Sequence, residues 1–169
     1  MAEYTPQERL QPFLLERVTD REPEKRMEGR DKRVANATEF RKALLQDLQW
    51  LLNSSCRPPS DEIHSYPEAA KSVLNFGIPE LAGTTSVTVK PEIIERLIRT
   101  AIQHFEPRVL RHSLEVSTVE SADGAGANIV QIEIHGEAWN VPMPESLFIK
   151  TEMDLETGQC KLKDQLHGG

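Results

Sequence analysis

Hydrophobic residues recur at helical spacing in two stretches of the chain. In residues 39–53 they lie three or four positions apart, with polar residues between them; they are Phe40, Leu44, Leu48, Leu51 and Leu52. Residues 91–105 repeat the pattern with Ile94, Leu97, Ile98, Ala101, Ile102 and Phe105. Both patterns predict amphipathic helices. Pro107 should end the second helix, so Glu106 is expected to leave the helical conformation.

The polar residues of these helices are expected to face water. In the first helix they are Arg41, Lys42, Gln46, Asp47 and Gln49. In the second helix, Glu95 precedes Arg99 by four positions, a spacing at which an ion pair stabilises a helix by about 0.2–0.5 kcal/mol. Between the two helices, a short helix is predicted over residues 67–74, with Ser65 and Glu68 at capping-box spacing.

From residue 114 onward the hydrophobic period changes to two, which indicates strands. The alternating apolar residues are Leu114, Val116, Val130, Ile132, Ile134, Leu147, Ile149 and Met153. A hairpin turn is predicted at DLETGQ, where Gly158 can adopt positive φ, with a return strand over 160–162. Helices followed by a strand meander predict an α+β fold, with helices packed on one face of a small antiparallel sheet.

The N-terminal region has a different composition. In residues 19–33, 11 of 15 side chains are charged, which is typical of a flexible linker. Before it lies a small apolar cluster of Leu10, Phe13, Leu14 and Leu15, which either packs on its own domain or docks on a partner. We therefore divide the chain into a flexible docking tail with a charged linker, residues 1–35, and a folded domain, residues 36–166.

Charge and composition exclude several classes of protein. The net charge is −7, and residues 120–169 hold nine acidic and three basic side chains. An acidic surface argues against nucleic-acid binding. No run approaches the about 18 apolar residues of a membrane span, and the N-terminus lacks the features of a signal peptide. Cys56 and Cys160 are expected to be two reduced thiols.

The sequence contains no metal-ligand spacing, phosphate-binding loop or nucleophile motif, so we expect no metal and no cofactor. One compact polar feature remains, Glu106-Pro107-Arg108, at the predicted junction between helix and sheet. It could be a structural clasp or a recognition point for another protein. An adjacent Arg favours an ionised carboxylate, which is unsuited to acid catalysis.

Four segments together resemble the TssE family of type VI secretion baseplate subunits, which belongs with the contractile-phage baseplate wedge proteins once labelled lysozyme-like. In chain order they are LQPFLLERVTD, SVLNFGIPELAG, HFEPRVL and PMPESLFIKTEMDLETG. They span nearly the whole chain. A Glu-Pro-Arg triplet alone is common, but after an amphipathic helix and between these neighbours it is fairly specific.

The resemblance implies a structural role in the cytoplasm, on a baseplate docked to the inner membrane. It implies that the TssF and TssG wedge subunits are partners, and that the TssB and TssC sheath proteins extend the sheet by adding strands. It leaves TssK as a candidate partner. The family's Glu-Pro-Arg motif falls on Glu106, Pro107 and Arg108 and is tied to sheath attachment.

Two alternatives stand beside this interpretation. One is a peptidoglycan hydrolase, as the older family label suggests, and the other is a soluble regulator or anti-adaptor of similar fold. For the adaptor, charged residues such as Glu133, Lys150 and Glu152 are expected to guard open sheet edges. The acidic C-terminal third is expected to favour a basic partner edge.

Overall fold

The computed structural model describes residues 37–82, 90–119, 128–139 and 144–164, together with Val18 and Glu24. The predicted docking cluster, nearly all of the charged linker and most of the glycine-containing loop SADGAGAN lie outside the described residues. The division of the chain at residue 35 therefore stays a prediction.

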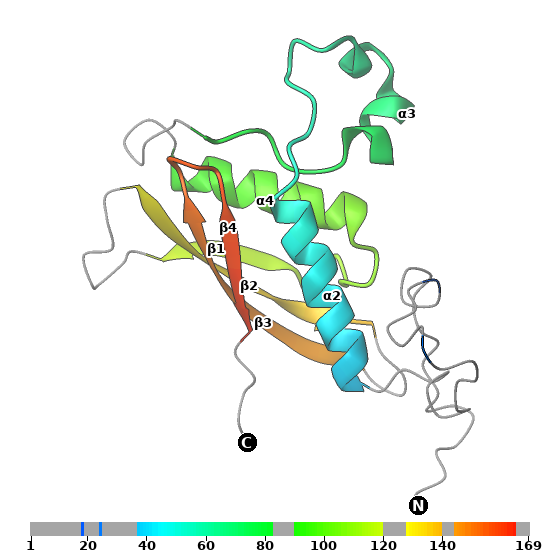
Figure 1. Ribbon diagram of the computed structural model, residues 1–169, viewed down its shortest axis with the longest axis vertical. Coiled ribbons are helices and arrows are strands. Elements are labelled where there is room, and N and C mark those ends of the chain that lie inside the picture. The colour runs from blue at the N-terminus through cyan, green and yellow to red at the C-terminus, as the bar shows by residue number, and fades with distance from the viewer. Residues whose placement is uncertain are drawn as a thin grey trace, which may run out of the picture.

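The sheet has four antiparallel strands in the order β1-β2-β3-β4, so neighbours in sequence are neighbours in space (Figure 1). They are β1 (Glu115–Val119), β2 (Ile129–Ala138), β3 (Glu145–Asp154) and β4 (Cys160–Asp164). Gly158 has a φ of +73° in the turn between β3 and β4, as predicted. The predicted meander and the α+β class are confirmed.

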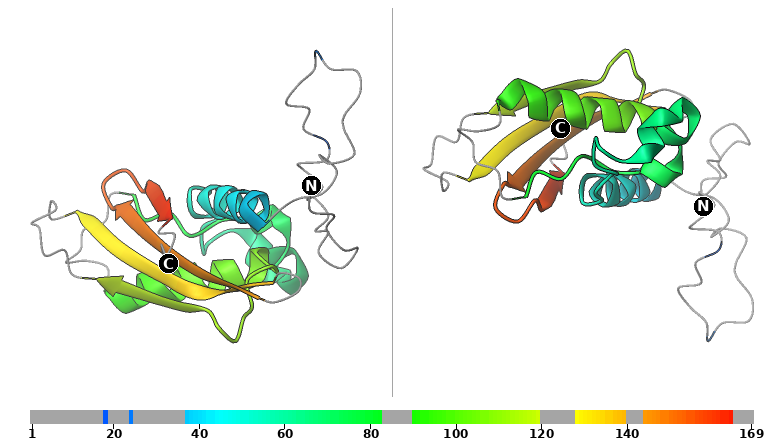
Figure 2. Two further views of the ribbon diagram at one scale, coloured as in Figure 1. Left: turned by 90° about the horizontal axis from the view of Figure 1, so that it is seen from below. Right: turned by 90° about the horizontal axis from the view of Figure 1, so that it is seen from above.

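Two long helices pack against one face of this sheet. They are α2 (Ala37–Leu52) and α4 (Pro91–Phe105), and α4 has the predicted bounds. Seen from below, the strands lie in front of α4; seen from above, α4 lies in front of the strands (Figure 2). Val116, Ile134 and Ile149 are aligned across three strands on the covered face and are almost fully buried. The apolar stripes of both helices complete this core.

An excursion of the chain, residues 54–78, separates α2 from the segment that leads to α4 and projects away from the sheet (Figure 1). It contains three short helical turns: η3 (Glu62–Ser65), α3 (Pro67–Ala70) and η4 (Val73–Asn75). The predicted single helix over 67–74 was wrong. Its helix ends at Ala70, and the Ser72 hydroxyl then accepts a hydrogen bond from the Leu74 amide and starts a separate turn. The predicted capping box is also absent, because Tyr66 is the N-cap of α3 and its side chain makes no capping bond.

The two ends of this excursion are joined at its base. The Cys56 amide donates to the Ile78 carbonyl at 3.0 Å, and the Ile78 amide donates to the Ser54 carbonyl at 2.9 Å. Between them Gly77 adopts a φ of +121°. The neighbouring Phe76 ring meets Phe105 of α4 edge-on, with centroids 5.3 Å apart. The excursion is therefore anchored to the core.

The prediction that Arg41 faces water was wrong. Arg41 is 9 % exposed, and its guanidinium lies 3.1 Å from a carboxylate oxygen of Glu145 and 3.0 Å from the carbonyl oxygen of Ser146. These residues begin β3, at the side of the sheet along which α2 runs. The helical pattern of α2 identifies its apolar stripe but cannot show that a sheet edge lies beside the polar flank.

Candidate functional site

The Glu-Pro-Arg triplet begins where α4 ends. Glu106 is the C-cap residue, with φ −122° and ψ 80°, so it leaves the helical conformation as predicted. Its amide still donates to the Ile102 carbonyl at 2.9 Å, while its own carbonyl accepts from the Val109 amide at 3.2 Å. The chain turns sharply over Pro107, which is exposed, and this turn brings Arg108 back towards Glu106.

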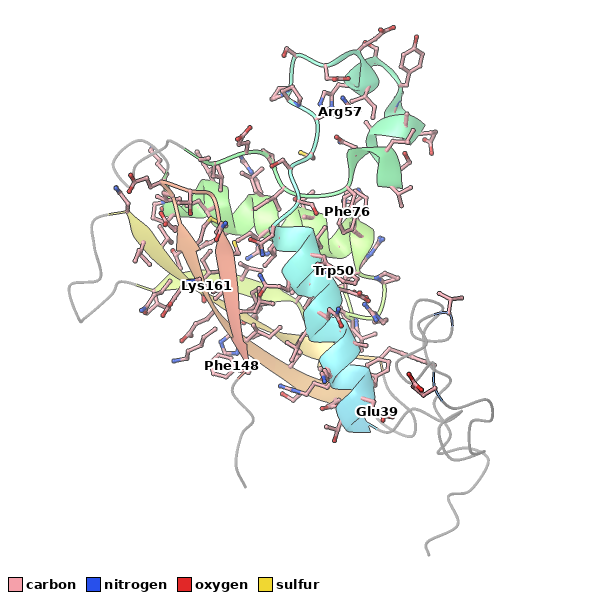
Figure 3. The ribbon with its side chains drawn as sticks, viewed as in Figure 1. Glu39, Trp50, Arg57, Phe76, Phe148 and Lys161 are labelled. Carbon is pink, nitrogen blue, oxygen red and sulfur yellow. The ribbon has the colours of Figure 1, made fainter. Side chains whose placement is uncertain are left out.

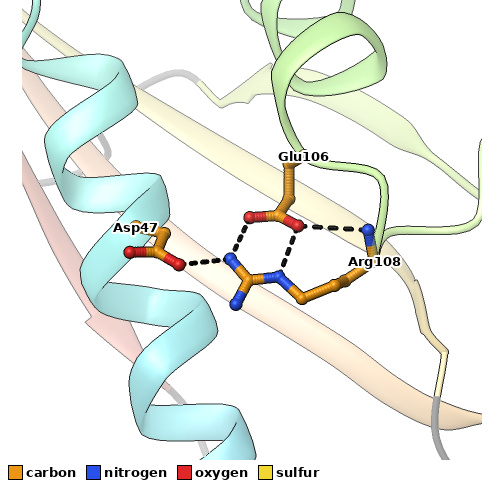
Figure 4. Close-up of polar contacts among 3 residues, drawn as sticks. All are labelled: Asp47, Glu106 and Arg108. Atoms are coloured by element: carbon orange, nitrogen blue, oxygen red, sulfur yellow. Dashed lines mark hydrogen bonds and ion pairs between the residues drawn. The ribbon is translucent and has the colours of Figure 1, made fainter. Parts of the chain in front are cut away.

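Arg108 closes this turn with a two-pronged ion pair (Figure 4). Its Nε donates to Glu106 Oε1 at 2.5 Å, and its Nη2 donates to Glu106 Oε2. The Arg108 backbone amide also donates to Oε1, at 3.1 Å. On its other side Nη2 lies 2.5 Å from Oδ2 of Asp47 on α2. The triplet thus ties the end of α4 to the middle of α2.

The charged groups of this clasp, Glu106, Arg108 and Asp47, are unequally exposed. The side chain of Glu106 is 4 % exposed, that of Arg108 is 13 % and that of Asp47 is 36 %. Burial by itself lowers the pKa of Arg108, but the hydrogen bonds and negative charge of Glu106, followed by those of Asp47, outweigh burial and raise it. The clasp therefore holds a firmly charged guanidinium among carboxylates.

The clasp also bears on the hydrolase alternative. Both carboxylate oxygens of Glu106 accept hydrogen bonds from Arg108. A general acid in a glycosidase must instead present a proton to its substrate, with a second carboxylate across the cleft. The arrangement of this triplet suits a structural or positioning role.

The chain that follows the clasp joins the sheet. The Trp139 amide donates to the Arg108 carbonyl at 2.7 Å, and the Leu110 amide donates to the Glu137 carbonyl at 2.8 Å. Val109 forms an antiparallel bridge with Ala138. Trp139 itself is 54 % exposed. The clasp consequently fixes a surface that contains Pro107, Trp139 and the end of β2.

The outer edge of β1 is closed by two charged side chains of α4. The Thr118 amide and hydroxyl both donate to Glu95 Oε1, at 2.7 and 2.8 Å. Arg99 Nη2 donates to the Val116 carbonyl at 3.1 Å. The pair predicted to stabilise α4 thus bonds to the backbone of the neighbouring strand.

The outer edge of β4 is closed by two neutral amide side chains at the end of α2. Asn53 pairs with Cys160 as a strand residue would: its Oδ1 accepts from the Cys160 amide at 2.9 Å, and its Nδ2 donates to the Cys160 carbonyl at 3.0 Å. Gln49 donates to the same carbonyl at 2.6 Å and accepts from the Leu162 amide at 3.1 Å. We call Gln49 and Asn53 the amide latch.

The charged residues expected to guard the edges lie elsewhere. Glu133 is on β2 and Lys150 and Glu152 are on β3, which are the two inner strands, so that prediction was wrong. The Lys150 ammonium lies 3.2 Å from Glu133 on the uncovered face, and its hydrogen bond lowers the pKa of that carboxyl. The side chains of Phe148 and Lys161 are drawn on this sheet in Figure 3. The alternation of apolar and polar residues identifies the two faces of each strand, but it does not show which strands lie at the edges of the sheet.

The edge-capping residues were missed by sequence reasoning. The helical pattern predicts Gln49 on the solvent face and Asn53 at the end of the helix, whereas both side chains bond to β4. A usable signal is present: Asn53 follows Gln49 by four positions, a spacing that makes two side chains neighbours on a helix flank. That flank lies along the side of the sheet formed by β3 and β4.

Cys56 and Cys160 are both free thiols, as predicted. Burial raises the pKa of Cys160 to about 12. Among the described residues, no group of three or more His, Cys, Asp or Glu side chains is placed to hold a metal ion. No helix in that part of the chain is long and apolar enough to cross a membrane. The N-terminal docking residues Leu10, Phe13, Leu14 and Leu15 lie outside the described residues, and their role stays a prediction.

Comparison with known protein families places the chain beside a described family. The family model described as "Baseplate wedge protein gp25" matches residues 38–143, which is more than half of the chain. The matched region includes α2 from its second residue, all of α4, the excursion, the clasp and the first two strands. Comparison with curated proteins and with solved structures gives no significant match.

Proposed function

Because the chain belongs to the baseplate wedge protein gp25 family, we propose that it is a structural baseplate subunit of a type VI secretion system. In this role it joins the wedge to the first ring of the contractile sheath and nucleates sheath assembly. TssF and TssG are its partners on the wedge side, TssB and TssC on the sheath side, and TssK is a candidate further contact. The subunit acts in the cytoplasm, on the inner-membrane-docked baseplate, without a cofactor.

One observation carries this proposal beyond the family assignment. The sheet is an open meander in which β1 and β4 each have one neighbouring strand among the described residues. An added strand can pair with such an edge, so that main-chain hydrogen bonds supply affinity and alternate side chains supply specificity. This geometry supports attachment of the sheath by sheet extension.

The triplet contributes to sheath attachment through the surface that it shapes. Glu106 and Arg108 face inward and bond to each other, whereas Pro107 and the nearby Trp139 are exposed. We assign the two charged residues to holding this surface in place and Pro107 to contact with the sheath or baseplate. An exposed contact residue and a buried clasp respond differently to substitution, which makes the assignment testable.

Sheath assembly on reconstituted baseplates tests the proposal. The Pro107→Ser variant should keep the thermal midpoint of the wild type and bind TssF and TssG normally, yet initiate fewer sheaths of TssB and TssC in electron micrographs. The Glu106→Ala/Arg108→Ala variant, assayed well below its own melting temperature, should also fail to initiate sheaths. Normal sheath numbers with both folded variants would leave the triplet a purely internal clasp.

Deletion of residues 1–18 tests the proposed docking tail. We expect weaker binding to the TssF–TssG wedge, because Leu10, Phe13, Leu14 and Leu15 are lost, while the thermal midpoint of the folded domain stays unchanged. A matched variant that replaces only these four residues by Ser separates loss of the apolar cluster from loss of length. A large fall in the midpoint would instead assign these residues to the core of this domain.

A further inference from the structure

We propose that the amide latch marks the β4 edge as the edge on which the partner strand docks, and that Gln49 and Asn53 occupy this edge until the strand replaces them. This inference rests on the proposed function, because it names the docking edge for sheet extension. Side chains at the end of α2 and on α4 close the two edges of the sheet with different kinds of hydrogen bond.

The hydrogen bonds at β4 are suited to exchange. The Asn53 side chain offers one acceptor and one donor to Cys160, the same groups that a peptide unit of an added strand would offer. When a strand arrives, the released amides can bond to water, because Asn53 is exposed and Gln49 is half-buried. Since neutral hydrogen bonds are replaced by others of the same kind, little free energy is lost in the exchange.

The hydrogen bonds at β1 resist exchange. Glu95 accepts two bonds from Thr118, and Arg99 donates to Val116, so both side chains make charge-assisted bonds, which are about twice as strong as neutral ones. The Arg99 Nε atom is already buried without a hydrogen-bond partner. Displacing these side chains would leave half-buried charges without their partners. The β1 edge is therefore the more firmly closed of the two.

The charge beside the β4 edge indicates the chemistry of the incoming strand. Lys161 is exposed and lies opposite Glu152 in the register. A fifth strand would place one of its own residues beside this lysine. Opposite charges across neighbouring strands are favourable and like charges are unfavourable. The occupant that fits is an extended segment with an acidic residue opposite Lys161, rather than the basic edge expected from the overall charge.

Binding of the full chain to purified TssB–TssC, measured by titration, tests this inference. In the Gln49→Ala/Asn53→Ala variant the latch no longer competes, so we expect about fivefold tighter binding, corresponding to about 1 kcal/mol for one hydrogen bond. The same substitutions should lower the thermal midpoint of the free protein. A higher affinity for TssB–TssC combined with a lower thermal midpoint is the signature of a competing latch. If the latch were a purely structural contact, its loss would lower both the affinity and the thermal midpoint. Lys161→Glu should weaken binding several-fold.

Controls distinguish this inference from the proposed function. Glu95→Ala opens the β1 edge and should leave the affinity for TssB–TssC unchanged. Should the double alanine variant fail to fold, Asn53→Ala alone removes both side-chain bonds to Cys160 and keeps Gln49, and it should also tighten binding. Tighter binding with Glu95→Ala alone, or unchanged binding with every variant, would overturn the latch and leave the adaptor function standing. Failure of the wild-type chain to bind TssB–TssC would overturn both.

Discussion

Replacing Glu106 by alanine is expected to lower the free energy of unfolding by about 3–5 kcal/mol, the cost typical of breaking a buried ion pair. The Arg108 side chain is only 13 % exposed, and the substitution removes its two-pronged partner and leaves Asp47 on one side. The acceptor of the Arg108 backbone amide is lost as well. The free energy of unfolding of a whole domain is typically about 5–15 kcal/mol, so this single substitution removes a large part of the stability. Urea unfolding followed by circular dichroism measures it.

Asp47→Ala provides the matched control within the same clasp. Its carboxylate touches the same guanidinium nitrogen but is 36 % exposed, so water screens the interaction and we expect a loss below about 1 kcal/mol. The order of the two effects is the test. Equal losses for Asp47→Ala and Glu106→Ala would mean that burial does not set the strength of the clasp.

Gly77→Ala is expected to open the base of the excursion. Gly77 has a φ of +121°, which L side chains rarely adopt, and a Cβ atom there would lie 2.2 Å from the Ser54 carbonyl oxygen. That oxygen accepts the hydrogen bond from Ile78, so the clash falls on the bridge that joins the two ends of the excursion. Strained backbone alone costs about 1–3 kcal/mol. We expect a fall in the thermal midpoint and faster proteolytic cleavage within residues 54–78.

Gly136→Ala is the corresponding control. Gly136 lies in β2, and a Cβ atom added there would meet its nearest neighbours at ordinary contact distances, 3.6 Å from Val109 and 3.7 Å from Leu114. We expect its free energy of unfolding to stay within about 0.5 kcal/mol of the wild type. A loss as large as that of Gly77→Ala would indicate a general sensitivity to added volume rather than a specific backbone requirement.

Local signals were sufficient for the regular elements. Pro91 and Pro107 bracket an apolar stripe at helical spacing, and α4 runs from Pro91 to Phe105. Gly158 follows an alternating strand pattern and takes positive φ in the turn. These features depend on neighbours within a few positions along the chain, so the sequence contains what is needed to predict them.

Features that depend on distant segments could not be predicted in the same way. Arg41 meets β3 more than a hundred positions away, and Asn53 meets β4 at a similar separation. A polar residue on a helix flank has the same local pattern whether it faces water or a sheet edge. The triplet is recognisable by its neighbours in the sequence, but Asp47, the third charged group of the clasp, is identified only by the position of α2 beside α4.

Substitutions in the clasp and in the amide latch are expected to affect stability and sheath binding in different ways. Loss of the clasp should disturb the fold and, through the surface around Pro107, initiation of the sheath. Loss of the latch should lower the stability of the free subunit and raise its affinity for TssB–TssC. Measuring stability and sheath binding on the same variants therefore assigns each residue to one effect or the other.

Hydrogen–deuterium exchange of the full chain, free and bound to TssB–TssC, tests sheath attachment by sheet extension most directly. In the free chain the backbone amides of Cys160 and Leu162 donate only to the side chains of the amide latch. If a partner strand adds to β4, main-chain hydrogen bonds replace these bonds, and both amides exchange more slowly in the complex. The strands β2 and β3 already have a neighbouring strand on each side, so the exchange of their amides should change little. A stable complex in which neither edge strand gains protection would contradict the account.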